Sequence, residues 1–289
     1  QRLSLGDHLQ LPPAVFVKQV EKHAAAHGEA GAAALARNHG ETWRQYVNLV
    51  RLRLPPVEGE LSPGQHASPD GVVELVTKVT GLKGLKYAGV QFYCGSHQHI
   101  IDFKERKAKI EERTGYLKGI IDRLEAAGLK PGIVTGSGTG THYIDAKLGV
   151  FTELQVGSYV FMDHDYNVCA LRGLDKPTFE QALQIDAHVV SSNTPGMVTV
   201  DAGLKAMATE KGPPMILKGA VEGSTTRFMG DEHLAVIAPE GKQAPGHGEQ
   251  VILTPPHCDP TVNLYEAYHV VKGDTLVEIW PVTARGRSR

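Results

Sequence analysis

Residues 255–261 read Pro-Pro-His-Cys-Asp-Pro-Thr and place an imidazole and a carboxylate two positions apart, at His257 and Asp259. Prolines on both sides favour an extended backbone, in which side chains at i and i+2 point to one side and Cys258 points to the other. One nitrogen and one oxygen ligand suit Zn²⁺, Mn²⁺ or a similar divalent cation, and they leave coordination positions for water or substrate. Taken alone, an H-x-D pair is more typical of a polar turn; together with the stretch upstream, the run predicts an open metal site.

A second stretch, residues 135–141, alternates glycines with hydroxyl side chains. Glycines let the backbone approach an anion closely, and successive N–H groups with Ser or Thr hydroxyls can hold a phosphate. The stretch lacks the Gly-Lys-Ser/Thr of a Walker loop and the register of the dinucleotide motif. We interpret it as a phosphate-binding loop, with a flexible surface turn as the alternative.

The elements around this loop follow an α/β order. A helix is predicted over about 104–127, because its apolar residues keep helical spacing and Gly128 supplies a stop. The short apolar run 132–134 then predicts a strand that leads directly into the glycine-rich loop, and residues 87–93 predict another strand. Helix, strand and loop in this order indicate an α/β unit with a functional loop at the carboxyl end of a strand.

The second half of the chain reads as a largely β domain. Strands are predicted over 188–190, 197–201, 234–237, 250–253 and 275–280, where β-branched residues alternate with turns. Nearer the start, an Ala-rich segment predicts a helix over about 14–36. We therefore expect a divergent N-terminal region over 1–83, an α/β domain over 84–184, and a mainly β domain over 185–289 that carries the metal site.

Composition excludes several classes of protein. The 289 residues are 41% hydrophobic and carry a formal net charge of −2, without a basic block that would indicate a nucleic-acid partner. No apolar stretch predicts a membrane span, no signal peptide is predicted, and three cysteines do not form a disulfide framework, which favours the cytoplasm. The chain begins with Gln1 rather than methionine, so its natural N-terminus is expected to be missing or processed.

From about residue 84 to 289, the chain resembles the D-threonine aldolase and D-serine dehydratase group of fold-type III pyridoxal phosphate enzymes. The resemblance rests on segments in the same order along the chain: 93–99, 135–141, 152–163, 201–205, 231–233, 257–263 and 280–286. This family is built like alanine racemase, from a TIM-type (β/α) barrel followed by a β domain. The resemblance implies a homodimer, pyridoxal phosphate, and a divalent metal (Mn, Mg or Zn).

The resemblance also implies a role for each candidate site residue. His257 and Asp259 would hold the metal, which coordinates the β-hydroxyl of a small-molecule β-hydroxy-D-amino acid. His99 would be the general base on that hydroxyl, and Tyr93 the active-site tyrosine at the end of the same strand. The cofactor phosphate would be held by Gly138, Thr139, Gly157, Ser158 and Tyr159. The implied reaction is a retro-aldol cleavage to glycine and an aldehyde, with the pyridine ring as electron sink.

Several alternatives remain at this level. Dehydratases of the group carry His-x-Cys at the metal site, so Asp259 favours the aldolase and a harder metal ion. His99 could be a polar residue at a strand end, Tyr159 a core residue, Ser158 a helix N-cap, and Lys205 a solvated lysine. Glu232 could line the active site or lie in an exposed turn.

The chain departs from the family in its N-terminal part. The Pro-His-Ala-Lys-Thr-His-like segment, whose lysine carries the cofactor, is not found, and neither is the Gly-x-x-Arg-Cys-Gly-like segment. Four lysines precede residue 84, namely Lys18, Lys22, Lys78 and Lys83, and none of them lies in a segment like the one that carries the cofactor in the family. A (β/α)₈ barrel takes about 250 residues, so we expect one that is abbreviated or rebuilt at its N-terminal side. A non-catalytic relative that still binds phosphate and metal is the alternative to an active lyase.

Overall fold

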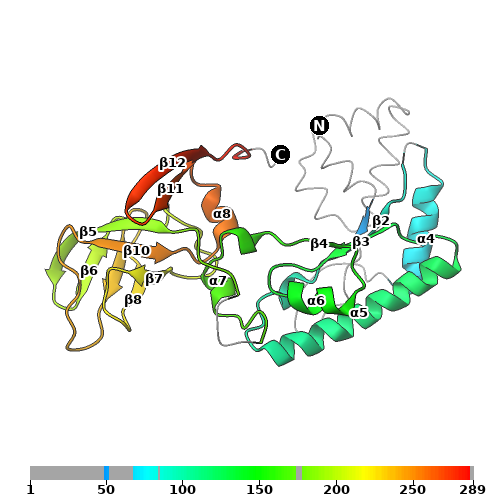
Figure 1. Ribbon diagram of the computed structural model, residues 1–289, viewed down its shortest axis with the longest axis horizontal. Helices are drawn as coiled ribbons and strands as arrows, with labels where there is room; N and C mark the ends of the chain where they lie inside the picture. Colours follow the sequence, from blue (N-terminus) through cyan, green and yellow to red (C-terminus); the bar gives the residue numbers. More distant parts are fainter. Residues whose placement is uncertain (1–48, 52–67, 84, 174–177, 287–289) are drawn as a thin grey trace. The chain divides into compact units, whose positions relative to one another are not determined.

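The computed structural model describes residues 49–51, 68–83, 85–173 and 178–286, with only the backbone for 49–51. The chain divides into two compact units, which are described separately (Figure 1). Unit 1 comprises the described residues up to Val156 together with Leu171–Gly173. Unit 2 comprises Gly157–Ala170 and the described residues from 178 onward.

Unit 1 contains a four-stranded parallel sheet whose strands are neighbours in chain order. Its strands are β1 (Leu49–Arg51), β2 (Gly89–Phe92), β3 (Ile133–Gly136) and β4 (Glu153–Leu154). The central pair is close: a Cβ on Gly89 would lie 1.8 Å from the carbonyl oxygen of Ile133. Position 89 therefore requires glycine. Parallel strands in consecutive order place the ends of β2 and β3, and hence the loops after them, at one edge of the sheet.

The helices of unit 1 are α4 (Pro69–Thr80), α5 (Phe103–Ala126), α6 (His142–Leu148) and the short 3₁₀ helix η1 (Gly95–His97). The two longest, α4 and α5, follow residues whose side chains accept a hydrogen bond from a backbone N–H of the first turn. Asp102 caps α5 by accepting a hydrogen bond from the Glu105 backbone N–H at 2.7 Å. The helix ends before Gly128, whose φ of 74° suits glycine. The helix predicted over about 104–127 is thereby confirmed.

The core of unit 1 lies between these helices and the sheet. Val72 and Val76 of α4 pack with Leu117 and Leu124 of α5, and all four are fully buried. Phe92 brings β2 into the same cluster. The buried positions of α5 keep helical spacing, which gives the helix one apolar face against the strands (Figure 1).

Unit 2 is built on a six-stranded antiparallel sheet in the order β7-β10-β5-β6-β9-β8. The strands are β5 (Ile185–Thr194), β6 (Met197–Val200), β7 (Met215–Lys218), β8 (Thr225–Phe228), β9 (Leu234–Ile237) and β10 (Gln250–Thr254). The outer strands β7 and β8 also contact each other, so the sheet curls towards closure. Alternating side chains of β5 are buried, among them Ala187 and Val189, and they pack on Leu234 and Leu253.

The remaining elements of unit 2 are short helices and a hairpin. They are η2 (Ser158–Val160), α7 (His164–Asn167), α8 (Cys258–Val262) and the antiparallel strands β11 (Ala267–Lys272) and β12 (Thr275–Pro281). The residues of β12 are exposed along its whole length. Among the described residues, no helix combines the length and the apolar character that crossing a bilayer requires.

The α/β and mainly β character predicted from the sequence is present in units 1 and 2. Each of the five strands predicted in the second half overlaps an observed strand, namely β5, β6, β9, β10 or β12. The sequence patterns missed β7, β8 and β11. Two of these are the edge strands of the six-stranded sheet, and none of the three strands has a fully buried side chain, so the alternation of apolar and polar residues that marks a strand is weak there. The helix predicted over about 14–36 lies outside the described residues.

Candidate active site

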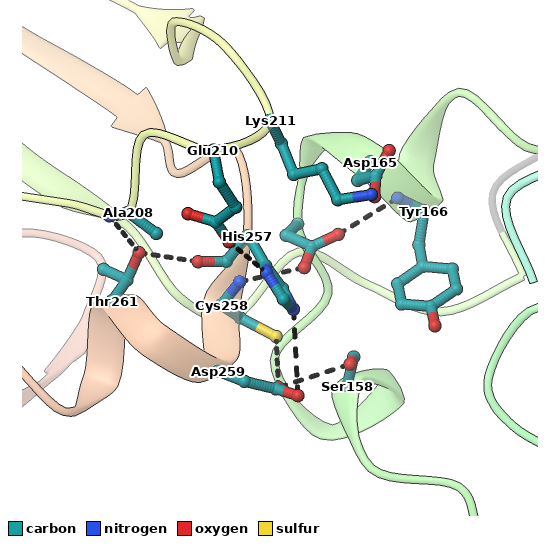
Figure 2. Close-up of polar contacts among 11 residues, drawn as sticks. Ser158, Asp165, Tyr166, Ala208, Glu210, Lys211, His257, Cys258, Asp259 and Thr261 are labelled. Atoms are coloured by element: carbon teal, nitrogen blue, oxygen red, sulfur yellow. Dashed lines mark hydrogen bonds and ion pairs between the residues drawn. The ribbon is translucent and has the colours of Figure 1, made fainter. Parts of the chain in front are cut away.

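The His257–Asp259 pair lies where β10 leads into α8. His257 is extended (φ −143°, ψ 122°) and caps α8, which begins at Cys258. The predicted extended conformation of the whole run is therefore wrong. Pro260 lies in the first turn of α8, where a backbone N–H is not needed, so the prolines start a helix here. The two side chains still converge, with His257 Nε2 3.8 Å from Asp259 Oδ2 (Figure 2).

A second carboxylate, Glu210, contacts the other side of the imidazole. Its Oε1 lies 2.5 Å from His257 Nδ1. Desolvation alone would raise the pKa of Glu210, but hydrogen bonds from His257 and from backbone amides outweigh it and lower the pKa. Within the described part of the chain, no three His, Cys, Asp or Glu side chains are grouped so as to hold a metal ion. The metal site thus stays a prediction, with His257 and Asp259 as its two candidate ligands.

Cys258 does not face away from the pair as predicted. It is fully buried, and its Sγ lies 3.2 Å from Asp259 Oδ1, to which it donates a hydrogen bond. The helical rather than extended backbone explains the difference, because side chains do not alternate along a helix. Burial raises the pKa of the Cys258 thiol, and the charges of Asp163 and Asp259 raise it further.

Ser158, in the segment expected to hold the cofactor phosphate, contacts Asp259 of the same pair. Ser158 is buried and its hydroxyl donates to Asp259 Oδ1 at 3.3 Å. Gly157 is exposed, and a Cβ there would meet nothing within 4 Å, which leaves open space beside its backbone. Tyr159 is 40% exposed and its ring lies 5.4 Å from that of Phe179, so it is not a core residue. Ser158 lies inside η2, whose N-cap is Gly157, so Ser158 is not a helix cap.

Asp163 accepts hydrogen bonds from both α7 and α8, and the sequence patterns did not identify it as a site residue. It is fully buried, and its two carboxylate oxygens accept from different backbone N–H groups. Oδ1 accepts from Tyr166 at 3.0 Å, which caps α7, and Oδ2 accepts from Cys258 at 2.9 Å, the first residue of α8. Met162, just before it, has a φ of 56°, a region that non-glycine residues seldom adopt. One carboxylate thus fixes the start of the helix that carries Asp259.

In unit 1, the glycine-rich loop packs on the residues that follow β2. The Tyr93 ring would lie 3.1 Å from a Cβ on Gly138 and 3.3 Å from one on Gly95, so it sits against both glycines. Tyr93 is 39% exposed, whereas Gly138 and Thr139 are buried. The structure therefore brings the predicted active-site tyrosine into contact with the predicted phosphate loop.

A buried glutamine, Gln98, holds this loop in place. Its Oε1 accepts from the backbone N–H of Gly140 at 3.1 Å, and its Nε2 donates to the Thr141 hydroxyl at 3.1 Å. The backbone N–H groups of Thr141 and His142 donate to the Gly138 carbonyl. These three amides are engaged within unit 1, so the predicted cradle of successive free N–H groups is not formed by residues 140–142. His99, the predicted base, follows Gln98 and is half-buried.

Two further expectations concern lysines. Lys205 is exposed and pairs with Glu232 at 2.6 Å and with Asp231 at 3.8 Å, so it is a solvated surface lysine. Lys78 and Lys83 are exposed as well, and Lys18 and Lys22 lie outside the described residues.

Sequence reasoning also missed Glu210, which lies within the Ala-Met-Ala-Thr-Glu-Lys segment. An acidic residue on an exposed loop gives no signal in a single sequence.

Comparisons with known proteins identify relatives of this chain. Residues 182–271 match the family model described as "Putative serine dehydratase domain". The chain is 36% identical over 221 residues to the 3-hydroxy-D-aspartate aldolase of Paracoccus denitrificans (strain Pd 1222), covering 75% of this chain and 56% of that protein. It is 38% identical over 236 residues to a D-threonine aldolase of Arthrobacter sp., covering 81% and 61%. The chain thus spans less than two thirds of the curated relatives it matches.

The chain is also similar to a solved structure. The crystal structure of D-threonine aldolase from Filomicrobium marinum has a TM-score of 0.75 and 32% sequence identity, covering 90% of this chain and 75% of that one. Identity at this level over most of both chains shows common descent. The chain belongs to the D-threonine aldolase and D-serine dehydratase family of fold-type III pyridoxal phosphate enzymes.

Proposed function

We propose that this chain is a lyase that depends on pyridoxal phosphate and a divalent metal and cleaves β-hydroxy-D-amino acids to glycine and an aldehyde. The observation that carries the proposal is the convergence of His257 and Asp259, with the Ser158 hydroxyl on the same carboxylate. The two relatives at 36% and 38% identity are both named as aldolases of such amino acids, which supports the same reaction class.

The metal pair favours the aldolase over the dehydratase. An imidazole and a carboxylate are ligands for Mn²⁺, Mg²⁺ or Zn²⁺, and the oxygen donor of Asp259 shifts the preference towards the harder ions. Dehydratases of the group have a cysteine at the position that Asp259 occupies here, whereas the thiol of this chain, Cys258, stands between the two ligand positions. The dehydratase of D-serine or 3-hydroxyaspartate is therefore the second candidate.

Each side chain has a proposed task. His257 and Asp259 would hold the cation, which supplies Lewis-acid activation of the substrate hydroxyl when it is bound. His99 would accept the hydroxyl proton on an imidazole nitrogen, for which its ordinary pKa range is suited. Tyr93, beside Gly138, would position the reacting groups.

Pyridoxal phosphate supplies the electron sink for the cleavage. We propose that its phosphate is bound by Gly138, Thr139, Gly157, Ser158 and Tyr159, as the family implies. The open space beside the Gly157 backbone supports this, because a phosphate needs close approach to a main chain without a Cβ. The amides of residues 140–142 are already engaged, so the donors of this loop would come from elsewhere in it.

We also propose that unit 1 is part of an abbreviated or rebuilt TIM-type barrel. Parallel strands in consecutive order and the match to the D-threonine aldolase structure support this. The division into 1–83, 84–184 and 185–289 remains a prediction. A homodimer is proposed because the β11–β12 hairpin exposes apolar side chains, namely Val271, Leu276, Val277, Ile279 and Trp280. A cytoplasmic location is proposed because all three cysteines are free thiols.

The cofactor experiment comes first. Purified protein is mixed with pyridoxal phosphate, its visible absorbance is recorded, and borohydride is added before peptide mapping. A protein-bound band that borohydride fixes to one lysine is expected. Absorbance that remains that of free cofactor would refute the covalent enzyme and leave a non-catalytic relative that binds only phosphate and metal.

Metal removal tests the second part of the proposal. We expect EDTA to abolish formation of glycine from D-threonine and Mn²⁺ to restore it. The variants Asp259→Ala and His257→Ala should not recover with metal, while His188→Ala, at an exposed position on β5, should behave like the wild type. Full activity in EDTA would contradict the metal role.

A further inference from the structure

We infer that Glu210 is a positioning residue for the metal pair: it fixes the proton of His257 on Nδ1 and leaves Nε2 to bind a divalent cation beside Asp259. The inference rests on the proposed function and extends it to a residue in a loop that the sequence did not mark. It concerns the orientation and tautomer of one imidazole, which can be measured without turnover.

The contact geometry decides which nitrogen carries the proton. His257 Nδ1 lies 2.5 Å from Glu210 Oε1, while Nε2 on the opposite side of the ring faces Asp259 Oδ2 at 3.8 Å (Figure 2). An ionised carboxylate can only accept a hydrogen bond, so Nδ1 must donate. In the neutral ring, the lone pair is then on Nε2, on the side of Asp259.

The segment that carries Glu210 is attached to α8 and to the residues beside it; Asp259 lies in α8 and His257 directly before it. The buried Thr261 hydroxyl accepts from the Ala208 backbone N–H at 3.0 Å and donates to the His257 carbonyl at 2.6 Å. Tyr265 donates through its hydroxyl to the Ala206 carbonyl at 2.6 Å. These bonds couple residues 206–208 to the helix that begins after His257, so Glu210 approaches the ring from a fixed backbone.

A second attachment ties the same segment to α7. Lys211 Nζ lies 2.8 Å from Asp165 Oδ2, and the Asp165 side chain is only 20% exposed (Figure 2). The residues on either side of Glu210 are therefore held by different elements of unit 2. A glutamate whose only role was a surface ion pair would need neither attachment, because exposed pairs contribute little to stability.

The chemistry of metal-binding histidines explains what such a carboxylate does. A histidine that ligates through one nitrogen commonly donates its other N–H to a carboxylate, which fixes the tautomer, orients the ring and raises the basicity of the ligand. Removal of such a partner costs about 10–100-fold in metal affinity. Glu210 occupies this place relative to His257, and Asp259 occupies the ligand side.

The test uses two variants of the full chain, Glu210→Ala and Glu210→Gln, and the control Glu240→Ala at an exposed position after β9. Two-dimensional ¹H–¹⁵N spectra of the imidazole rings report the tautomer, and the His257 signals are assigned as those missing in His257→Asn. Titration with Mn²⁺ followed by electron paramagnetic resonance gives the dissociation constant. Circular dichroism checks that each variant is folded.

We expect the wild type and Glu240→Ala to show the Nδ1–H tautomer and equal Mn²⁺ affinity. Glu210→Ala should shift His257 towards the Nε2–H tautomer and weaken Mn²⁺ binding about 10–100-fold. Glu210→Gln keeps an acceptor oxygen and should retain the tautomer, with affinity within a few fold of the wild type. A role in folding alone would not be rescued in this way.

Two results overturn the inference in different ways. If the wild type binds Mn²⁺ and Glu210→Ala keeps both the tautomer and the affinity, Glu210 does not position the ring, while the proposed metal pair stands. If the wild type does not bind Mn²⁺, the metal pair itself is refuted, and the role of Glu210 is refuted with it.

Discussion

Replacing Asp163 by asparagine should loosen the start of α8, which carries the proposed ligand Asp259. The carboxylate is fully buried and each of its oxygens accepts from a different backbone N–H, Tyr166 at 3.0 Å and Cys258 at 2.9 Å. An amide has one acceptor oxygen, so asparagine can satisfy only one of these donors and must turn its NH₂ group towards the other. The shape of the side chain is unchanged, so the substitution isolates the hydrogen bonds.

The magnitude follows from the number of bonds lost. A hydrogen bond to a charged group contributes about 1.5–3 kcal/mol, and a buried donor left without a partner costs a similar amount. Asp163→Asn should therefore lower the free energy of local opening by about 2 kcal/mol, and Asp163→Ala, which loses both bonds, by about 3 kcal/mol or more. Since about 1.4 kcal/mol is a factor of ten, exchange of the Cys258 amide should become roughly 30-fold faster in Asp163→Asn.

Hydrogen exchange followed by mass spectrometry measures this locally, which matters because the chain has two compact units. Peptides that cover residues 254–262 and 163–169 should lose protection, while peptides from β5 and β6 should not. Asp274→Asn, in the exposed turn between β11 and β12, is the matched control. If Asp163→Asn exchanges in α8 at the rate of the wild type, the carboxylate does not hold the helix and the reasoning is refuted.

Three further predictions concern packing and titration. Gly140→Ala should destabilise unit 1 by about 1–3 kcal/mol in urea unfolding, because the new Cβ would lie 1.9 Å from the Gln98 carbonyl oxygen. Gly119→Ala lies in α5 with nothing within 4 Å of the new Cβ, so it should stabilise unit 1 by about 0.5–1 kcal/mol. Equal effects of the two substitutions would contradict the close contact between Gly140 and Gln98. Burial raises the pKa of Cys94 from 9.0 to about 12 and that of Tyr87 from 10.0 to about 12. Above pH 9, the unfolded chain therefore binds fewer protons than the folded chain. The free energy of unfolding should fall between about pH 9 and 12 and stay constant from pH 7 to 8.5, and urea midpoints measured at each pH would show this. All three cysteines are buried free thiols, so a thiol reagent at pH 8 should label none in the native protein and three in urea; rapid labelling of one in the native state would place it at the surface.

The sequence alone determined the elements whose patterns are local. The spacing of apolar residues in α5 and the glycine after it predicted that helix to within a residue or so, and β-branched runs predicted five strands of unit 2. The same sequence marked His257 and Asp259 as a pair, since both lie within one short run. Local patterns suffice for these elements because helix and strand periodicity depends only on neighbouring residues. His257 and Asp259 converge although the run is not extended, as the i, i+2 argument required.

The strands that the patterns missed show the limit of that reasoning. β7 and β8 lie at the two edges of the six-stranded sheet, and most of their side chains are exposed. An edge strand forms because a neighbouring strand offers backbone donors and acceptors, so its own side chains need not alternate. The same dependence on partners applies to the run after β10, where the prolines favoured an extended chain and the structure forms α8.

The surroundings of the metal pair were decided by the tertiary structure. Three residues that are distant in the sequence contact this pair or Cys258 between its members. Glu210 lies 47 residues from His257, Asp163 lies 95 residues from Cys258, and Ser158 lies 101 residues from Asp259. No periodicity links residues at such separations, and a single acidic residue on a loop or at a helix start looks like any other. Only the fold of unit 2 brings a carboxylate to Nδ1 of His257, a second to the first amide of α8 and a hydroxyl to Asp259, because these contacts depend on how β10, α7 and the 206–211 segment pack together.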